Sequence, residues 1–399
     1  MSTTYRFILA LVVSLIPGWS QALTLRTTSL EELYKHAHIV VLAEVETISA
    51  RPWATKPGAT WSDVHIRVLS TFKGTPGERL TVGLPGGSRN GVSTLVFGVP
   101  QLSVGQRAVF MLERVGDDLV PLNYGQGVWP EEVASAFSGG PIRSAQHHNS
   151  VTRFKVMTTT SGAQVHWSNR CVEVWTNDVG STVFDSLAIR QVLAESFAHW
   201  EDAQGGELQG IDRGYTCFDE VGFDDWPGPQ NVIQFREEEG SWKHPPKIAG
   251  LTTIMYREHN GEIVDADIEF NLVSERFTVD GSVDSFSLRY TMTHELGHLL
   301  GLDHSTIHAS VMAVNSVPKN VGDFGLHPDD KNAIAANYPA GEGDASCGAN
   351  NYFAAGASYC PAAPESSGCT ASVGSAPWAL LLSLLCLAFV RRDRRLGRL

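Results

Sequence analysis

Short runs of alternating apolar and polar residues dominate the first third of the chain. Val64, Ile66 and Val68 are separated by His65 and Arg67, which is the two-residue period of a strand with one buried face. Turn-forming glycine and proline residues separate this run from similar ones. The pattern predicts a short helix at 29–36, opened by a serine N-cap, and strands at 39–48, 64–72, 79–84, 95–99, 107–113 and 119–124.

These six strands predict one small all-β domain over residues 23–130. Six short strands with regular turns are typical of a barrel, and an OB-like barrel is one candidate. Residues 131–150 are predicted to be a linker, because a Ser-Gly-Gly-Pro sequence lies at their centre. An OB-like fold would not define a function, since that fold binds oligonucleotides as well as sugars.

Helical periodicity replaces the strand pattern after residue 150. Ile189, Leu193, Phe197 and Trp200 recur at helical spacing and predict an amphipathic helix at 185–201. The further elements predicted here are strands at 231–235, 248–256 and 263–270, a long helix opened by Asp284 or Ser285, and a last helix at 328–338.

Residues 151–340 are accordingly predicted to form a second domain of the α+β class. An Asn-Gly pair between its second and third strands is a strong hairpin signal. Residues 341–376 are rich in Gly, Ala, Ser and Pro, which predicts a low-complexity spacer rather than a further domain.

The composition is that of an ordered, acidic protein. Of the 399 residues, 43% are hydrophobic and 18% are charged, which excludes a disordered chain and is sufficient for two or three packed domains. The formal net charge is −13, and no basic stripe is visible in the sequence. Nucleic acid is therefore not an expected partner, because binding it requires clustered Lys and Arg.

Both ends of the chain have the composition of targeting segments. Residues 1–22 combine one arginine, a short apolar run and a small-x-small site, which predicts a secretory signal peptide. Residues 377–399 contain a short apolar helix followed by five arginines, and Cys369 lies just upstream. This arrangement resembles the tripartite sorting tail of myxobacterial surface proteins, in which the cysteine marks the processing site.

The two segments imply an exported protein, located at the cell envelope or outer surface or secreted. The membrane is expected to be contacted only through the C-terminal tail. The alternative interpretation of that tail is a plain single-pass anchor whose arginines stay in the cytoplasm.

The stretch H-E-L-G-H-L-L-G-L-D-H carries the main chemical signal. Residues four apart share one helix face, so His294 and His298 are predicted to bind one Zn²⁺. Gly301 suits the left-handed turn that ends the helix and returns His304 as third ligand. Three protein ligands leave an open position, which is typical of a catalytic zinc site. Glu295 is predicted to be the general base for water there.

This stretch matches H-E-x-x-H-x-x-G-x-x-H, the metzincin signature. Met312 follows His304 by eight residues and is interpreted as the methionine of the Met-turn. With the paired aspartates of the last helix, these features resemble the matrixin branch of the metzincins over about residues 165–340. The resemblance implies a zinc endopeptidase with a twisted sheet, an active-site helix, a Met-turn and a C-terminal helix.

The resemblance also implies how a substrate would bind. An extended peptide is expected to add to an antiparallel edge strand above the cleft. In this sequence that strand is expected to include the residues Ile248, Ala249, Gly250 and Leu251. The expected partner is therefore an extended polypeptide, and the chain is expected to act as a monomer.

Two features depart from the matrixin pattern. The strand before the active-site helix contains Asp265, Asp267 and Glu269, with an acid where matrixins have a histidine for a second zinc. A second zinc is therefore not expected, and Ca²⁺ held by carboxylates is an alternative. Residues 23–150 contain no cysteine, so they lack the thiol that blocks the zinc in matrixin pro-segments.

Four of the six cysteines are candidates for disulfides, because an exported chain meets oxidising conditions. Four cysteines allow three pairings, and the sequence does not decide between them. Pairing within local segments favours Cys171 with Cys217 and Cys347 with Cys360.

The sequence thus predicts a secreted or cell-surface zinc endopeptidase. The alternative is a catalytically weak surface adhesion or binding protein in which the 23–130 domain is the functional module. Glu295 favours the enzyme, because a site that has lost its catalysis commonly lacks this base.

Overall fold

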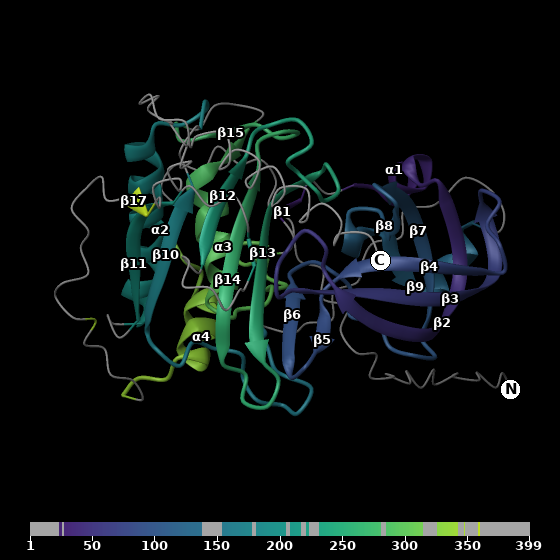
Figure 1. Cartoon of the computed structure of the whole chain (residues 1–399), viewed down its shortest axis with the longest axis horizontal. Coiled ribbons are helices and arrows are strands. Elements are labelled where there is room, and N and C mark those ends of the chain that lie inside the picture. The colour runs from purple at the N-terminus through teal and green to yellow at the C-terminus, as the bar shows by residue number, and fades with distance from the viewer. Residues whose placement is uncertain are drawn as a thin grey trace, which may run out of the picture. The chain divides into compact units, whose positions relative to one another are not determined.

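The chain folds as an antiparallel sheet from its N-terminal part and a mixed sheet covered by helices, as the computed structural model shows (Figure 1). The described residues all belong to the compact unit Met1–Cys360, and none belongs to the second unit, Pro361–Leu399. The structure describes residues 24–25, 28–137, 154–177, 181–204, 208–216, 221–222, 231–280, 285–313, 325–341, 347 and 358–359.

The N-terminal sheet is antiparallel and has the strand order β4-β3-β2-β7-β8, with β9 also paired to β7. Helix α1 (Leu30–His36) precedes it and is capped by Ser29, whose Oγ accepts a hydrogen bond from Glu32 N at 3.2 Å. The OB-like closure stays a prediction. The strands are β2 (Ile39–Pro52), β3 (Thr60–Lys73), β4 (Arg79–Pro85), β7 (Arg107–Val115), β8 (Asp118–Pro121) and β9 (Val128–Pro130).

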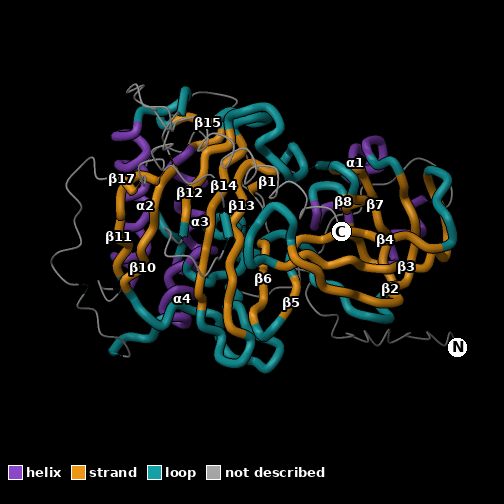
Figure 2. The backbone as a smooth tube through the Cα atoms, viewed as in Figure 1, coloured by secondary structure: helices purple, strands orange, loops and turns teal. Residues whose placement is uncertain are grey.

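The second sheet has nine strands among the described residues, in the order β17-β11-β10-β12-β14-β13-β6-β5, with β1 also paired to β13 (Figure 2). Its first half is parallel, whereas β14, β13, β6 and β5 alternate in direction. The strands are β1 (Thr24–Leu25), β5 (Gly87–Arg89), β6 (Val92–Val96), β10 (Cys171–Asn177), β11 (Gln209–Thr216), β12 (Val232–Arg236), β13 (Ile248–Arg257), β14 (Ile263–Asn271) and β17 (Ser358–Tyr359). A separate parallel pair joins β15 (Phe277–Thr278) to β16 (Phe286–Ser287).

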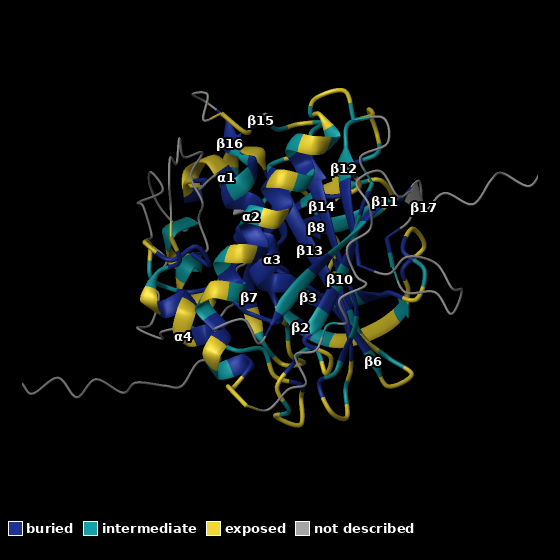
Figure 3. Cartoon of the chain, turned by 90° about the vertical axis from the view of Figure 1, so that its left-hand side faces the viewer, coloured by how far each residue is buried: buried dark blue, intermediate teal, exposed yellow. Residues whose placement is uncertain are grey.

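Three helices pack on the mixed sheet: α2 (Ser186–Gln204), α3 (Leu288–Leu299) and α4 (Pro328–Asn337). The residues predicted for the apolar face of α2 are all buried, while its outer side is exposed (Figure 3). Helix α3 contacts both α2 and β13 and is buried along nearly its whole length. The predicted active-site helix therefore lies in the interior, between another helix and the sheet.

The strand predicted at 95–99 belongs to the mixed sheet and not to the N-terminal sheet. It is β6, which begins and ends three residues earlier than predicted, at Val92 and Val96. It lies beside β13 and carries β5 on its other side (Figure 1). Leu95 packs in the core of the mixed sheet, whereas Val96 packs in the N-terminal core. Because both faces of β6 are buried, its local pattern does not indicate which sheet it joins.

The end of the N-terminal part also differs from the prediction. The strand predicted at 119–124 ends at Pro121, and a 3₁₀ helix, η1 (Tyr124–Gly127), follows it. The expected linker at 131–150 begins with a second 3₁₀ helix, η2 (Glu131–Phe137). The Phe137 ring stacks on Tyr34 with 5.4 Å between centroids, so this part of the linker is packed.

The N-cap of α3 is Ser287 rather than Asp284 or Ser285. Its Oγ accepts a hydrogen bond from Tyr290 N at 3.3 Å. The short strand β16 occupies the preceding residues, which moves the start of the helix.

A disulfide joins Cys171 to Cys347, with 5.6 Å between their Cα atoms. The expected pairing of Cys171 with Cys217 and of Cys347 with Cys360 is therefore wrong. Chain proximity was a poor guide, because the chain returns after α4 to the start of β10, where the Arg170 guanidinium donates to Pro339 O at 2.7 Å. Cys217 and Cys360 themselves lie outside the described residues.

The predicted targeting segments, 1–22 and 377–399, and Cys369 also lie outside the described residues and stay predictions. Within the described ranges, no helix is both long and apolar enough to cross a bilayer.

Candidate metal centre

Helix α3 places two imidazoles side by side in the interior. His294 and His298 are one turn apart and fully buried, and their Nε2 atoms are 3.1 Å apart. This is the geometry that the i, i+4 spacing predicts for one helix face.

A glycine turn brings the third histidine to the same point. Gly301 has φ +83°, and a Cβ added there would lie 2.3 Å from Val165 O, so only glycine fits. After this turn, His304 Nε2 lies 2.9 Å from His298 Nε2 and 3.0 Å from His294 Nε2. The three histidines form the one cluster of three or more metal-binding side chains among the described residues.

Hydrogen bonds from the Nδ1 atoms of the two helical histidines leave their Nε2 atoms free to bind a cation. His294 Nδ1 donates to Val311 O at 2.7 Å, and His298 Nδ1 donates to Leu302 O at 2.8 Å. A carbonyl oxygen only accepts, so the proton of each ring is on Nδ1 and the Nε2 atom presents a lone pair. Lone pairs that converge in a buried site suit a metal ion, and three imidazole ligands suit Zn²⁺.

Burial keeps these rings neutral. It lowers the pKa of His294 to about 4. Burial, reinforced by the neighbouring imidazoles, holds the pKa values of His298 and His304 well below the usual range. Neutral imidazole is the form that ligates a metal, so the cluster has this form at neutral pH.

Met312, the predicted methionine of the Met-turn, packs against α3 between the two helical histidines. A Cβ added at Gly297 would lie 2.3 Å from Met312 Sδ and 2.8 Å from the Trp200 ring, so the glycine between the two helical histidines makes room for the thioether. Met312 is buried in the same core as α3.

A carboxylate from α4 holds the Met-turn in place. Asp330 accepts hydrogen bonds from Val311 N at 2.9 Å, from Met312 N at 3.2 Å and from the Ser310 hydroxyl. It also accepts from His327 N at 2.9 Å as part of the capping box of α4. The sequence indicated a pair of aspartates at the start of this helix, but not that one of them binds the turn.

Glu295 is buried beside the ligands with an exposed fraction of 1%. The Thr252 hydroxyl, on β13, donates to Glu295 Oε2 at 2.6 Å and fixes the carboxylate. A Cβ added at Gly250 would lie 2.8 Å from Glu295 Oε1, so the strand also makes room for the second oxygen. The orienting role of Thr252 carried no signal in the sequence.

The strand expected at the edge of the sheet is antiparallel to β14, but it is not an edge in this chain. Ile248, Ala249, Gly250 and Leu251 are all buried in β13. The other side of β13 is paired with β6 and β1, both from the N-terminal part. The expectation of an open edge was therefore wrong for the full chain.

The acidic residues of β14 form a separate buried group. Asp267 accepts a hydrogen bond from Val232 N at 2.8 Å, and Glu269 pairs with the ammonium of Lys56. Burial alone would raise the pKa of Glu269, but Lys56, His244 and Arg236 hold it well below its usual value. Ca²⁺ at this group stays a prediction.

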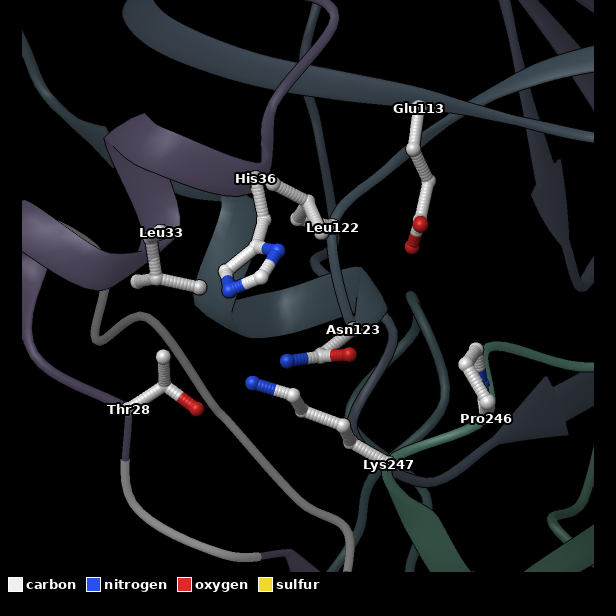
Figure 4. A pocket seen from close by; sticks show the side chains of 8 residues that line it. All are labelled: Thr28, Leu33, His36, Glu113, Leu122, Asn123, Pro246 and Lys247. Carbon is white, nitrogen blue, oxygen red and sulfur yellow. The ribbon is translucent and has the colours of Figure 1, made fainter. Parts of the chain in front are cut away.

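A cavity of about 110 Å³ lies elsewhere, between α1, β7 and the residues before β13 (Figure 4). It contains none of the predicted site residues. Its lining residues are Thr28, Leu33, His36, Glu113, Leu122, Asn123, Pro246 and Lys247.

Known proteins resemble the part of the chain that carries the cluster. Residues 166–339 match the matrixin family model; they are less than half of the chain and include the three histidines, Glu295 and Met312. A stretch of 77 residues, 19% of this chain, is 39% identical to matrix metalloproteinase-21 of Xenopus laevis and likewise to that of Cynops pyrrhogaster. The chain spans 12% of the length of each of these relatives. The family match supports a matrixin-type metalloprotease over residues 166–339.

Proposed function

We propose that this protein is a zinc-dependent endopeptidase. Its metal ligands are His294, His298 and His304, and its general base is Glu295. The observation that carries the proposal is the convergence of three buried imidazole nitrogens, no more than 3.1 Å apart, beside a carboxylate fixed by Thr252. The matrixin match over residues 166–339 favours this enzyme over the surface adhesion protein considered above.

The chain's own residues supply the proton transfers. Zn²⁺, when bound, supplies Lewis acidity, which makes water more acidic and polarises a peptide carbonyl. Glu295 Oε2 is held by the Thr252 hydroxyl. The carboxylate is thus oriented to take a proton from the attacking water and to deliver it to the leaving amine. The buried surroundings strengthen these electrostatic interactions.

The substrate proposed for this site is an extended polypeptide that would pair with β13. We also propose that the protein is exported through its N-terminal segment and retained at the envelope through its C-terminal tail. The composition supports no nucleic-acid partner.

The test is Glu295→Gln in the full chain, with Glu239→Gln in an exposed loop as matched control. Peptide products from a mixed peptide library are followed by mass spectrometry over hours, which detects slow turnover, and bound zinc is measured by atomic absorption. We expect one Zn²⁺ per chain in all three proteins. Turnover should fall by about 10²–10⁴-fold in Glu295→Gln alone, the range for removal of a general base.

Measurable turnover that is equal in the two variants would contradict the role of Glu295. A chain that binds no zinc would contradict the metal centre itself.

A further inference from the structure

The N-terminal part of the chain covers the strand on which a peptide would bind. β6 pairs antiparallel with β13 from Val92 opposite Arg257 to Val96 opposite Thr253 (Figure 1). β1 pairs with the first residues of β13, with Thr24 opposite Gly250. The backbone groups of one strand edge pair with one partner strand at a time, so a substrate cannot add there while these segments are in place.

The residue after β6 reaches the proposed catalytic centre. Phe97 N donates to Thr252 O at 3.2 Å, on the same threonine whose hydroxyl holds Glu295. The Phe97 ring stacks on His298 with 4.0 Å between centroids and 17° between planes. Its exposed fraction is 3%, so the ring is enclosed between the sheet and the imidazole. Phe97 thus covers a proposed metal ligand with a side chain that cannot ligate a metal.

The chain then turns away from the centre. Gly98 has φ +84°, and its carbonyl accepts a hydrogen bond from Gly125 N, within η1, at 2.9 Å. Val99 N bonds back to Val96 O at 3.3 Å. The segment therefore pairs with β13 as a substrate would, but its backbone turns away from β13 after Phe97.

Buried contacts also join the N-terminal sheet and η1 to β13, β14 and the loop before β13. The Lys56 ammonium pairs with Glu269 and donates to Thr253 Oγ1 at 3.2 Å. The Tyr124 hydroxyl lies 3.1 Å from His244 Nδ1. Apolar residues of β13 and the loop before it share one core with the N-terminal sheet, namely Trp242, Ile248, Leu251 and Met255. Withdrawal of the whole N-terminal part from β13 would break these contacts and leave buried polar groups unpaired, which favours the closed arrangement.

We propose that residues 92–97 are an intramolecular, substrate-like strand that keeps the catalytic centre closed in the full chain, and that peptide cleavage requires its displacement. This inference rests on the proposed peptidase function. It needs no cysteine, in agreement with the absence of cysteine from residues 23–150.

The test compares Phe97→Ala with Phe72→Ala in the zinc-loaded full chain. Phe72 lies at the end of β3 and packs on Phe137, away from β13, so its loss serves as the matched control. Two rates are measured: cleavage of a quenched peptide, and extraction of Zn²⁺ by a chromogenic chelator. Phe97→Ala should raise both rates about tenfold or more, where each tenfold corresponds to about 1.4 kcal/mol in the opening equilibrium. Phe72→Ala should raise neither.

Phe97→Leu is the second variant, because it keeps an apolar side chain and removes the ring that stacks on His298. It should raise both rates in the same direction, but less than alanine does. Unchanged zinc extraction in both Phe97 variants would overturn the inference. If all the proteins also cleaved the peptide at equal rates, the peptidase proposal would still stand. Faster zinc extraction without cleavage in any protein would support the covering strand and contradict the peptidase.

Discussion

At the scale of single residues, the centre depends on side chains that touch no ligand directly. Asp330 is the main example, since its buried carboxylate collects hydrogen bonds from three residues of the Met-turn. One of these residues, Val311, supplies the carbonyl that receives His294 Nδ1. The carboxylate therefore fixes the orientation of a proposed ligand through the backbone of the turn.

Asp330→Asn should weaken both the fold and the metal site. An amide presents one accepting oxygen in place of two, so buried donors of the Met-turn lose their partner, at a cost of about 2–4 kcal/mol in the free energy of unfolding. Zinc affinity should fall about 10–100-fold, the effect typical of losing an outer-shell partner. Urea unfolding and competition with a zinc-binding dye measure the two effects. Asp117→Asn, in an exposed turn, is the control. Equal free energies of unfolding and equal zinc affinities in the two variants would rule out this role of Asp330.

At the scale of elements, β14 is unusual because alternate residues of a central strand are acidic. Asp265, Asp267 and Glu269 are all buried. Glu269 is paired with Lys56. Burial raises the pKa of Asp267 to about 6, against the lowering effects of the Val232 N–H and Lys56. Burial and the neighbouring Asp267 raise the pKa of Asp265 well above its usual value.

This arrangement predicts a pH dependence of stability. The ordinary pKa of Asp267 is 3.8, and it is about 6 in the fold, so the folded state holds the proton more tightly. Stability from this group is therefore present below pH 3.8 and is lost as the pH rises to about 6. Asp267→Asn removes the titration and keeps an oxygen for Val232 N. The variant should gain stability relative to the wild type between pH 4 and pH 7, on the order of 2 kcal/mol.

Urea unfolding at the two pH values measures this difference. Asp202→Asn on the exposed side of α2 serves as control and should follow the wild type at both. A gain that is the same at both pH values would show that Asp267 does not titrate in this range.

At the scale of the whole molecule, the Cys171–Cys347 bond closes a long covalent loop. Its cysteines are 176 residues apart, so the bond spans the proposed catalytic residues. It fixes the chain after α4 to the start of β10, beside the Arg170–Pro339 hydrogen bond. A crosslink over a loop of this length limits the unfolded chain more than the folded one.

Replacement of both cysteines by serine should lower the free energy of unfolding by about 2–5 kcal/mol, because the unfolded chain regains the freedom of this loop. Urea unfolding of the double variant and the wild type, both without reductant, measures the loss. Addition of reductant should bring the wild type towards the variant. Equal stability of the two oxidised proteins would show that this bond does not stabilise the fold.

Local spacing along the chain was sufficient to predict several features of this protein. The i, i+4 histidines and the glycine that ends the helix follow from periodicity and backbone preference, whereas Met312 was identified through the resemblance to the metzincins. The structure brings the three histidines together at one point. Most strands and helices were located for the same reason, since the two-residue and 3.6-residue periods are local properties. Helix α3 began later than predicted, because a short strand occupies Phe286 and Ser287.

Other features depend on contacts between residues that are distant in the sequence, and only the folded chain shows them. Thr252 contacts Glu295, which is 43 positions away in the sequence. Phe97 packs on His298, although strands of both sheets separate the two residues in the sequence. The pairing of β6 with β13 and of Cys171 with Cys347 depends on which surfaces the fold brings together. A strand buried on both faces has no preferred sheet in its own pattern, and a cysteine carries no mark of its partner. Only the packing of the whole chain supplies that information.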